Sequence, residues 1–126
     1  MSDKKTILIA EDEAPMLMAL AKKFQDKGFA VIEAIDGQAA LDKAMENKPD
    51  IILLDIIMPK MEGIEVMRRI REDKKWGSDV PIVMLTNLSD ADNVAEASKY
   101  GVYDFLVKTD WRLDDIVDIV KQKLFI

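Results

Sequence analysis

Five polar side chains suited to chemistry stand at the ends of apolar runs in the sequence. They are Glu11 and Asp12 after "TILIA", Asp55 after "IILL", Thr86 after "VPIVML" and Lys108 after "YDFLV". Asp55 is the most conspicuous, because a charged side chain among large aliphatic residues is costly unless another group pairs with it. The sequence therefore raises the question of what balances the charge of Asp55.

The types of these residues favour phosphoryl transfer that depends on Mg²⁺. Crowded carboxylates repel one another until a proton or a cation relieves the repulsion. The chain has no histidine and no cysteine, and oxygen ligands alone select a hard ion such as Mg²⁺. A lysine and a hydroxyl beside such an ion suit the oxygens of a phosphoryl group that a carboxylate attacks at phosphorus. We therefore expect Asp55 to be a nucleophile whose charge is balanced by Mg²⁺ and Lys108.

The elements that must position these residues alternate along the chain. The expected strands are 6–10, 29–34, 51–55, 80–86 and 103–108. Helical patterns of 3.6-residue period follow each strand, clearest at the end of the chain and weakest over 91–100. Such alternation predicts a doubly wound α/β fold with five parallel strands and helices on both faces, of the flavodoxin-like kind with strand order 2-1-3-4-5.

This order brings the five polar residues to one edge of the sheet. Ligands of open α/β sheets bind beyond the carboxyl ends of the strands, where the strand order reverses. Each residue alone has an ordinary explanation: Thr86 as a turn residue, Lys108 as a solvated strand end, and Glu11 with its neighbour Asp12 as acidic residues at a helix start. Their convergence at one edge favours a functional site.

The composition narrows the class of protein. The chain has 126 residues, nearly half of them apolar, which is enough for one domain with a real core. No apolar run is long enough to span a membrane, and the first residues lack a signal-peptide pattern. The formal net charge of −6 argues against nucleic-acid binding. We therefore expect a single domain over residues 1–126, located in the cytoplasm, without a membrane or direct nucleic-acid partner.

The sequence resembles the receiver domain of two-component response regulators, typified by the bacterial chemotaxis regulator. The resemblance covers essentially the whole chain, and its markers occur in the order and spacing of that family: "ILIAEDE", "AIDGQAAL", "PDIILLDIIMPKMEGIEVMRRIR", "VPIVMLT" and "DFLVK". It implies the same fold. It also implies a role in phosphorelay signalling, in which the domain takes a phosphoryl group from a sensor histidine kinase or a histidine phosphotransfer protein.

The resemblance assigns roles at the metal and phosphoryl site. Asp55 corresponds to the phosphoacceptor and also to a metal ligand. Asp12 would bind Mg²⁺ directly, Glu11 mostly through water, and the backbone carbonyl of Ile57 would be a further ligand. Lys108 would contact the phosphoryl oxygens.

A second group of residues would transmit the change. Thr86 would move its hydroxyl toward the phosphoryl group, and Phe105 takes the place of the family's aromatic switch residue. The neighbouring Asn87 would also contact the phosphoryl group. The output surface would consist of the fourth helix, the fifth strand and the fifth helix, and it would control a partner protein or an output domain.

Several positions depart from the family pattern. The usual lysine–proline pair is Lys108–Thr109 here. A cis peptide bond at this place would be energetically unfavourable, because it would lack the proline that lowers the free energy of the cis form. Asn87 replaces a small residue and is expected to narrow access to the phosphate. Phe105 has no hydroxyl, so its switching would rest on packing, and Tyr103 is expected on the same side of the strand.

Two apolar residues next to the expected phosphoryl group suggest slow hydrolysis. Ile57 and Leu88 lie two positions after Asp55 and Thr86, which are positions that flank the phosphoryl group in the family. Neither can orient an attacking water. We therefore hypothesise a long-lived phosphoaspartate.

Three other interpretations compete with that of a working receiver. A phosphatase of the haloacid-dehalogenase type would need an aspartate where Ile57 stands. A flavin-binding module would need a loop rich in Ser, Thr or Gly instead of the acidic "EDEAP". A degenerate receiver that no longer takes phosphate is the main rival, because of Asn87 and the Lys108–Thr109 pair. The kinase, the output and the oligomeric state are left open by the sequence.

Overall fold

The protein is described here from a computed structural model, which describes residues 4–86, 91–102, 104–108 and 112–126. Five parallel strands form one sheet: β1 (Thr6–Ala10), β2 (Ala30–Ala34), β3 (Ile51–Asp55), β4 (Ile82–Thr86) and β5 (Asp104–Val107). Five helices connect and flank them: α1 (Ala14–Asp26), α2 (Gly37–Asn47), α3 (Gly63–Arg71), α4 (Ala91–Ser98) and α5 (Leu113–Leu124). The strand order is β2-β1-β3-β4-β5, as the sequence predicts.

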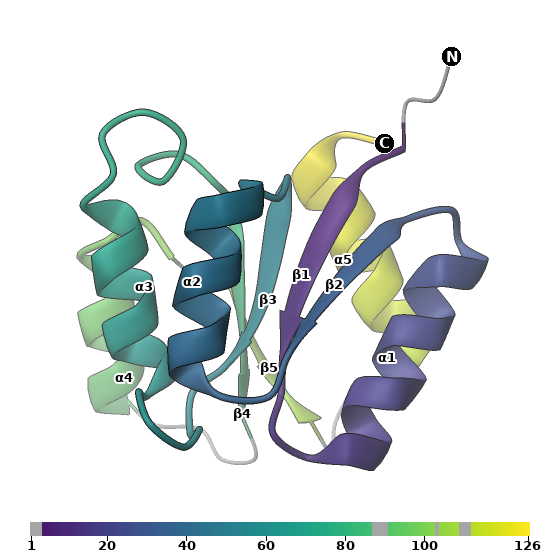
Figure 1. The fold of residues 1–126 in the computed structure, drawn as a ribbon, viewed down its shortest axis with the longest axis horizontal. Helices are drawn as coiled ribbons and strands as arrows, with labels where there is room; N and C mark the ends of the chain where they lie inside the picture. The colour runs from purple at the N-terminus through teal and green to yellow at the C-terminus, as the bar shows by residue number, and fades with distance from the viewer. Residues whose placement is uncertain (1–3, 87–90, 103, 109–111) are drawn as a thin grey trace.

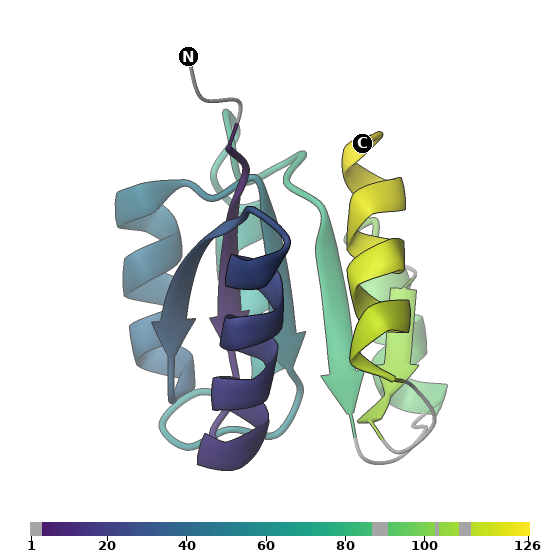
Figure 2. The same ribbon diagram turned by 90° about the vertical axis from the view of Figure 1, so that its right-hand side faces the viewer.

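The helices form a layer on each face of the sheet. Figure 1 shows α2, α3 and α4 on one side of the strands and α1 with α5 on the other, and Figure 2 shows the molecule with α1 and α5 facing the viewer. Successive strand residues point to opposite faces. In β1, Ile7 and Ile9 therefore join the apolar cluster under α1 and α5, whereas Leu8 and Ala10 join the cluster under α2, α3 and α4.

The helix starts follow from local chemistry. Asp36 caps α2, because its carboxylate accepts a hydrogen bond of 2.7 Å from the backbone N–H of Ala39. Pro15 stands in the first turn of α1, where its missing N–H costs nothing. Among the helices of the described chain, none combines the length and apolar character needed to cross a bilayer.

Two strands begin later than the sequence predicts. The predicted strand over 29–34 starts at Ala30, because the Phe29 N–H donates to the Phe24 carbonyl at 3.0 Å and so closes the end of α1. The predicted strand over 80–86 starts at Ile82, because the Val80 N–H donates to the Trp76 carbonyl and Pro81 has no N–H to donate.

The fifth strand and the fourth helix also have other bounds than the sequence predicts. β5 covers Asp104–Val107 instead of 103–108, and Tyr103 lies outside the described residues. α4 ends at Ser98, and the chain then turns at Gly101, whose φ of 76° suits glycine.

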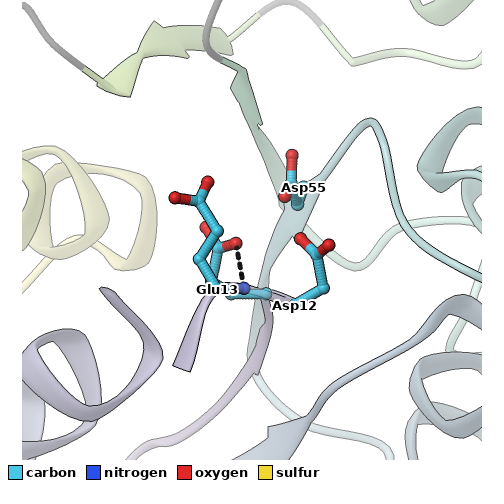
Figure 3. A group of neighbouring side chains, drawn as sticks. Asp12, Glu13 and Asp55 are labelled. Carbon is cyan, nitrogen blue, oxygen red and sulfur yellow. Dashed lines mark hydrogen bonds between the residues drawn. The ribbon is translucent and has the colours of Figure 1, made fainter. Parts of the chain in front are cut away.

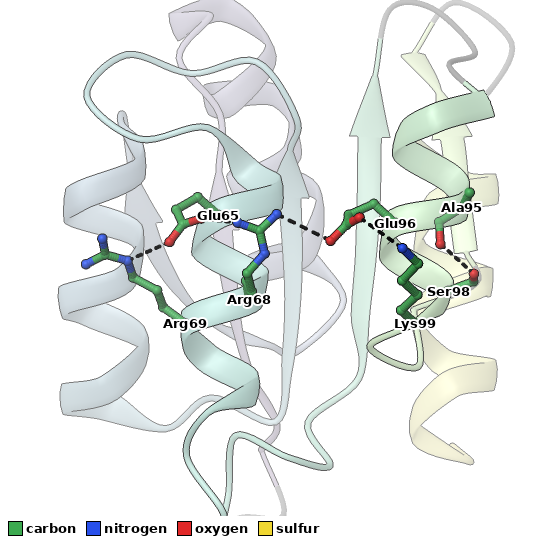
Figure 4. Close-up of polar contacts among 7 residues, drawn as sticks. All are labelled: Glu65, Arg68, Arg69, Ala95, Glu96, Ser98 and Lys99. Atoms are coloured by element: carbon green, nitrogen blue, oxygen red, sulfur yellow. Dashed lines mark hydrogen bonds and ion pairs between the residues drawn. The ribbon is translucent and has the colours of Figure 1, made fainter.

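Polar contacts join α3 to α4 and to the residues just after it. Arg68 on α3 reaches Glu96 on α4 at 3.4 Å (Figure 4). Arg71 donates from Nε to the Tyr100 carbonyl at 2.8 Å, just after the end of α4. Ala97 is fully buried, but Val94 is 41% exposed. Among the described side chains of α4, the apolar anchoring is therefore thin, in agreement with the weak apolar pattern of the sequence over 91–100.

Candidate functional site

The carboxyl edge of the sheet collects buried polar residues. Asp55 is the last residue of β3 and Thr86 the last of β4. The loop after β1 begins with Glu11, which has no exposed surface, while Asp55 and Thr86 are 4% and 5% exposed. Buried polar groups of this kind need partners, because water is not available to them.

Lys108 supplies the positive charge at this edge. It follows β5 directly, and its side chain is only 6% exposed. Its Nζ atom lies 3.0 Å from Oδ2 of Asp55 and 3.0 Å from Oε1 of Glu13, and it also forms an ion pair with the carboxylate of Glu11. The structure thus brings Lys108 and Asp55 together, 53 residues apart in the sequence.

Burial and pairing shift the pKa values of these groups. Burial raises the pKa of Glu11 to about 7, against the lowering effect of its hydrogen bonds from Lys108 and from the Glu13 N–H. Burial also raises the pKa of Asp55, although Lys108 opposes this effect. For Lys108, burial lowers the pKa, but the hydrogen bonds to its three carboxylate partners outweigh burial and raise it above the ordinary value.

A small cavity opens beside the Asp55 carboxylate. It has a volume of about 140 Å³ and is lined by Asp12, Glu13, Asp55, Ile57 and Thr86. The Ile57 side chain is 69% exposed at this place. The cavity therefore gives solvent-side access to a carboxylate that is otherwise enclosed.

The donor set fits a hard divalent cation. Carboxylate oxygens of four residues lie within 4.8 Å of one another: Glu11, Asp12, Glu13 and Asp55. In Figure 3 the Asp12 carboxylate is directed toward Asp55, while the Glu13 side chain extends on the other side. Oxygen ligands without nitrogen or sulfur suit Mg²⁺ rather than zinc or copper.

Glu13 belongs to this group although it was not among the predicted site residues. Its position directly after Glu11 and Asp12 is the sequence signal that could have included it. Its backbone N–H donates to Oε2 of Glu11 at 3.0 Å, and its carboxylate reaches Lys108.

The loop after β3 holds the Asp55 backbone in place. The Gly63 N–H donates to the Ile56 carbonyl at 2.7 Å. A Cβ atom on Gly63 would lie 2.1 Å from the Asp55 carbonyl oxygen, so only glycine permits this approach. The first turn of α3 therefore packs directly against the end of β3.

The remaining predicted residues fall into two groups. Phe105 is half-buried on β5 and packs against the apolar cluster under α2, α3 and α4. Asn87, Leu88 and Thr109 lie outside the described residues, as does the Lys108–Thr109 peptide.

Comparison with known sequences gives one family. The sequence model of the response regulator receiver domain matches residues 7–121. The phosphate regulon transcriptional regulatory protein PhoB of Pseudomonas aeruginosa is 38% identical over 104 residues, which are 82% of this chain and 45% of that protein. The alkaline phosphatase synthesis transcriptional regulatory protein PhoP of Bacillus subtilis is 36% identical over 104 residues, which are 82% of this chain and 42% of that protein. The chain spans less than half the length of these relatives.

Solved structures agree with the sequence matches. The chemotaxis response regulator CheY4 of Vibrio cholerae superposes with a TM-score of 0.86 at 27% identity, covering 94% of this chain and 98% of that one. CheY in the CheX–CheY–BeF₃–Mg²⁺ complex of Borrelia burgdorferi gives a TM-score of 0.83 at 29% identity, covering 97% and 90% of the two chains.

The names of the sequence relatives conflict with one expectation. PhoB and PhoP are called transcriptional regulators, whereas the sequence analysis expects no direct nucleic-acid partner. That expectation came from the net charge of −6, a property of the printed residues only. It does not extend to proteins more than twice as long.

Proposed function

Because this chain belongs to the response regulator receiver family, we propose that it accepts a phosphoryl group on Asp55. The donor in this proposal is the phosphohistidine of a sensor histidine kinase or of a histidine phosphotransfer protein. An Asp55 oxygen attacks phosphorus, the P–N bond breaks, and the imidazole leaves with the electron pair. Self-catalysed phosphotransfer and dephosphorylation are then the only chemistry of the domain.

One observation carries the proposal. The Lys108 Nζ lies 3.0 Å from Oδ2 of Asp55 at the edge of the sheet, and the second side of that carboxylate faces the cavity of about 140 Å³. An enclosed carboxylate with an ammonium on one side and open space on the other suits nucleophilic attack on a phosphoryl group. Lys108 would stabilise the charge that develops on the phosphoryl oxygens.

The acidic residues would hold Mg²⁺. Asp12 and Asp55 would be direct ligands, Glu11 would act mostly through water, and the Ile57 carbonyl would complete the protein's share. Bound there, the ion would neutralise phosphoryl oxygens during transfer. The proximity of the carboxylates supports this assignment, as does the Borrelia relative, whose name includes BeF₃ and Mg²⁺.

The output of the reaction is proposed to be a change in the α4–β5–α5 surface. Thr86 and Phe105 would respond to the phosphoryl group, and the thin apolar anchoring of α4 supports a helix that moves. The surface would act on a downstream protein or on an output domain. We also propose that residues 1–126 form one receiver domain that works in the cytoplasm.

Phosphorylation by a small donor tests the function directly. The protein is incubated with Mg²⁺ and acetyl phosphate, and its intact mass is recorded beside an Asp55→Asn control. We expect the mass of one phosphoryl group to be added to the wild type, and none to the variant or to the wild type with a chelator. An unmodified wild type that still binds Mg²⁺ would favour the degenerate receiver.

A further inference from the structure

Glu13 is a carboxylate at the site that the proposed reaction does not use. Its Oε1 atom lies 3.0 Å from the Nζ atom of Lys108. Its side chain is 53% exposed, whereas Glu11 has no exposed surface and Asp55 is 6% exposed at the side chain. Among the partners of Lys108 in the described part of the chain, Glu13 is therefore the one with substantial access to solvent.

Three carboxylates surround the ammonium group of Lys108: it donates hydrogen bonds to Glu13 and Asp55, and Glu11 forms an ion pair with it. An ammonium group has three N–H donors and no acceptor. The three carboxylates of Glu11, Glu13 and Asp55 all contact it. A phosphoryl oxygen that is to bind Lys108 must therefore take a place beside the ammonium group that one of these carboxylates now holds.

The burial of each carboxylate determines which of them can move away from Lys108 at the lowest cost in free energy. Glu11 and Asp55 are enclosed by protein, so a move away from Lys108 would leave a buried charge without a partner, which is strongly unfavourable. Glu13 can turn toward water at small cost, because an exposed ion pair contributes little. It also lines the cavity beside Asp55, so its negative charge faces the path of an anionic donor.

We propose that Glu13 is a positioning residue that restrains phosphorylation by holding Lys108 and by repelling the donor. This inference rests on the proposed function of Asp55. In the unphosphorylated protein Glu13 occupies one donor of Lys108, and during transfer it yields that donor to the phosphoryl group. Removal of its charge therefore makes phosphorylation faster.

The Glu13→Gln variant tests this inference against Glu46→Gln, a matched loss of one exposed carboxylate on α2. We expect Glu13→Gln to be phosphorylated by acetyl phosphate about three- to tenfold faster than wild type at low salt, with a smaller gain at high salt. Phosphoramidate, which carries less negative charge, should give a smaller gain. Glu46→Gln should match the wild type.

Mg²⁺ affinity separates this role from that of a metal ligand. Titration of Mg²⁺ should give dissociation constants within about threefold of each other for wild type and Glu13→Gln, since Glu13 is engaged with Lys108. If Glu13→Gln bound Mg²⁺ more than about tenfold more weakly than the wild type, Glu13 would be a metal ligand and the inference would be overturned.

The phosphorylation rates give a second way to overturn the inference about Glu13. An unchanged or slower reaction of Glu13→Gln, with the wild type phosphorylated normally, would remove the role of Glu13 and leave the proposed function intact. A wild type that takes no phosphoryl group would remove both.

Discussion

Asp55 lies at the end of a strand that is buried along its whole length. Its charge is tolerated there because Lys108 contacts it directly, and because the cavity gives its other side access to solvent. Burial acts against this balance and raises the pKa of Asp55, and the charge of Asp55 in turn contributes to the raised pKa of Glu11. The residue is thus held in a state that a cation would stabilise further, which is the condition expected of a metal-assisted phosphoacceptor.

The lifetime of the phosphoaspartate is predicted to depend on Ile57. This side chain lines the cavity and offers no hydrogen bond to an attacking water. We expect Ile57→Asn to shorten the lifetime about three- to tenfold, the effect of one hydrogen bond worth roughly 0.5–1.5 kcal/mol. The measurement is the loss of ³²P label after the donor is removed.

Ile35→Asn is the matched control, because Ile35 is also an exposed isoleucine but is absent from the lining of this cavity. Its lifetime should equal that of the wild type. A slower loss of label from Ile57→Asn, or loss within seconds from the wild type, would contradict the hypothesis of a long-lived phosphoaspartate.

Among the elements, β3 and α3 make a close contact at Asp55, the proposed acceptor. Gly63 allows the first turn of α3 to approach the Asp55 carbonyl. We predict that Gly63→Ala lowers the free energy of unfolding by about 1–3 kcal/mol, the usual cost of overpacking, and slows phosphorylation because the end of β3 must shift. Urea unfolding and acetyl phosphate kinetics measure the two effects.

Gly101→Ala serves as the comparison. Gly101 has a positive φ but no atom near its missing Cβ, so alanine there should cost about 1–2 kcal/mol of backbone strain without changing the phosphorylation rate. If Gly63→Ala phosphorylated as fast as Gly101→Ala, the β3–α3 contact would not position Asp55.

The polar attachment of α4 leads to a prediction about its motion. Arg68 pairs with Glu96 across the two helices, whereas Arg69 pairs with Glu65 within α3 (Figure 4). We expect Arg68→Ala to speed amide hydrogen exchange over residues 91–98 by about two- to fivefold, a modest factor because the pair is partly exposed. Arg69→Ala should leave this exchange unchanged. Equal exchange in both variants would mean that the ion pair does not restrain α4.

At the scale of the whole molecule, the layered architecture could be predicted from the sequence. Continuous apolar runs such as Ile51–Leu54 indicate strands buried on both faces, and the alternation with helices fixes a parallel sheet. The meeting of Asp55 and Lys108 follows from that topology, because parallel strands end at one edge. Membership of the receiver family was recognised from the same motifs and is confirmed by the match over residues 7–121.

Features that depend on side-chain direction or backbone bonding could not be predicted in this way. Glu13 reaches a lysine 95 residues away because of the backbone conformation just before α1, which the residue type does not encode. The sequence predicts Phe29 in a strand because phenylalanine suits strands, but its N–H closes the end of α1. The roles of Asn87, Leu88 and Thr109 stay predictions.

A phosphoryl group on Asp55 is proposed to change the α4–β5–α5 surface. Backbone amide NMR spectra of the wild type and of Asp55→Asn, recorded with Mg²⁺ before and after acetyl phosphate, test it most directly. We predict chemical-shift changes around Asp55 and across α4, β5 and α5 in the wild type, little change over α2, and none in the variant. Changes confined to the surroundings of Asp55 in a protein that is phosphorylated by mass would contradict the account.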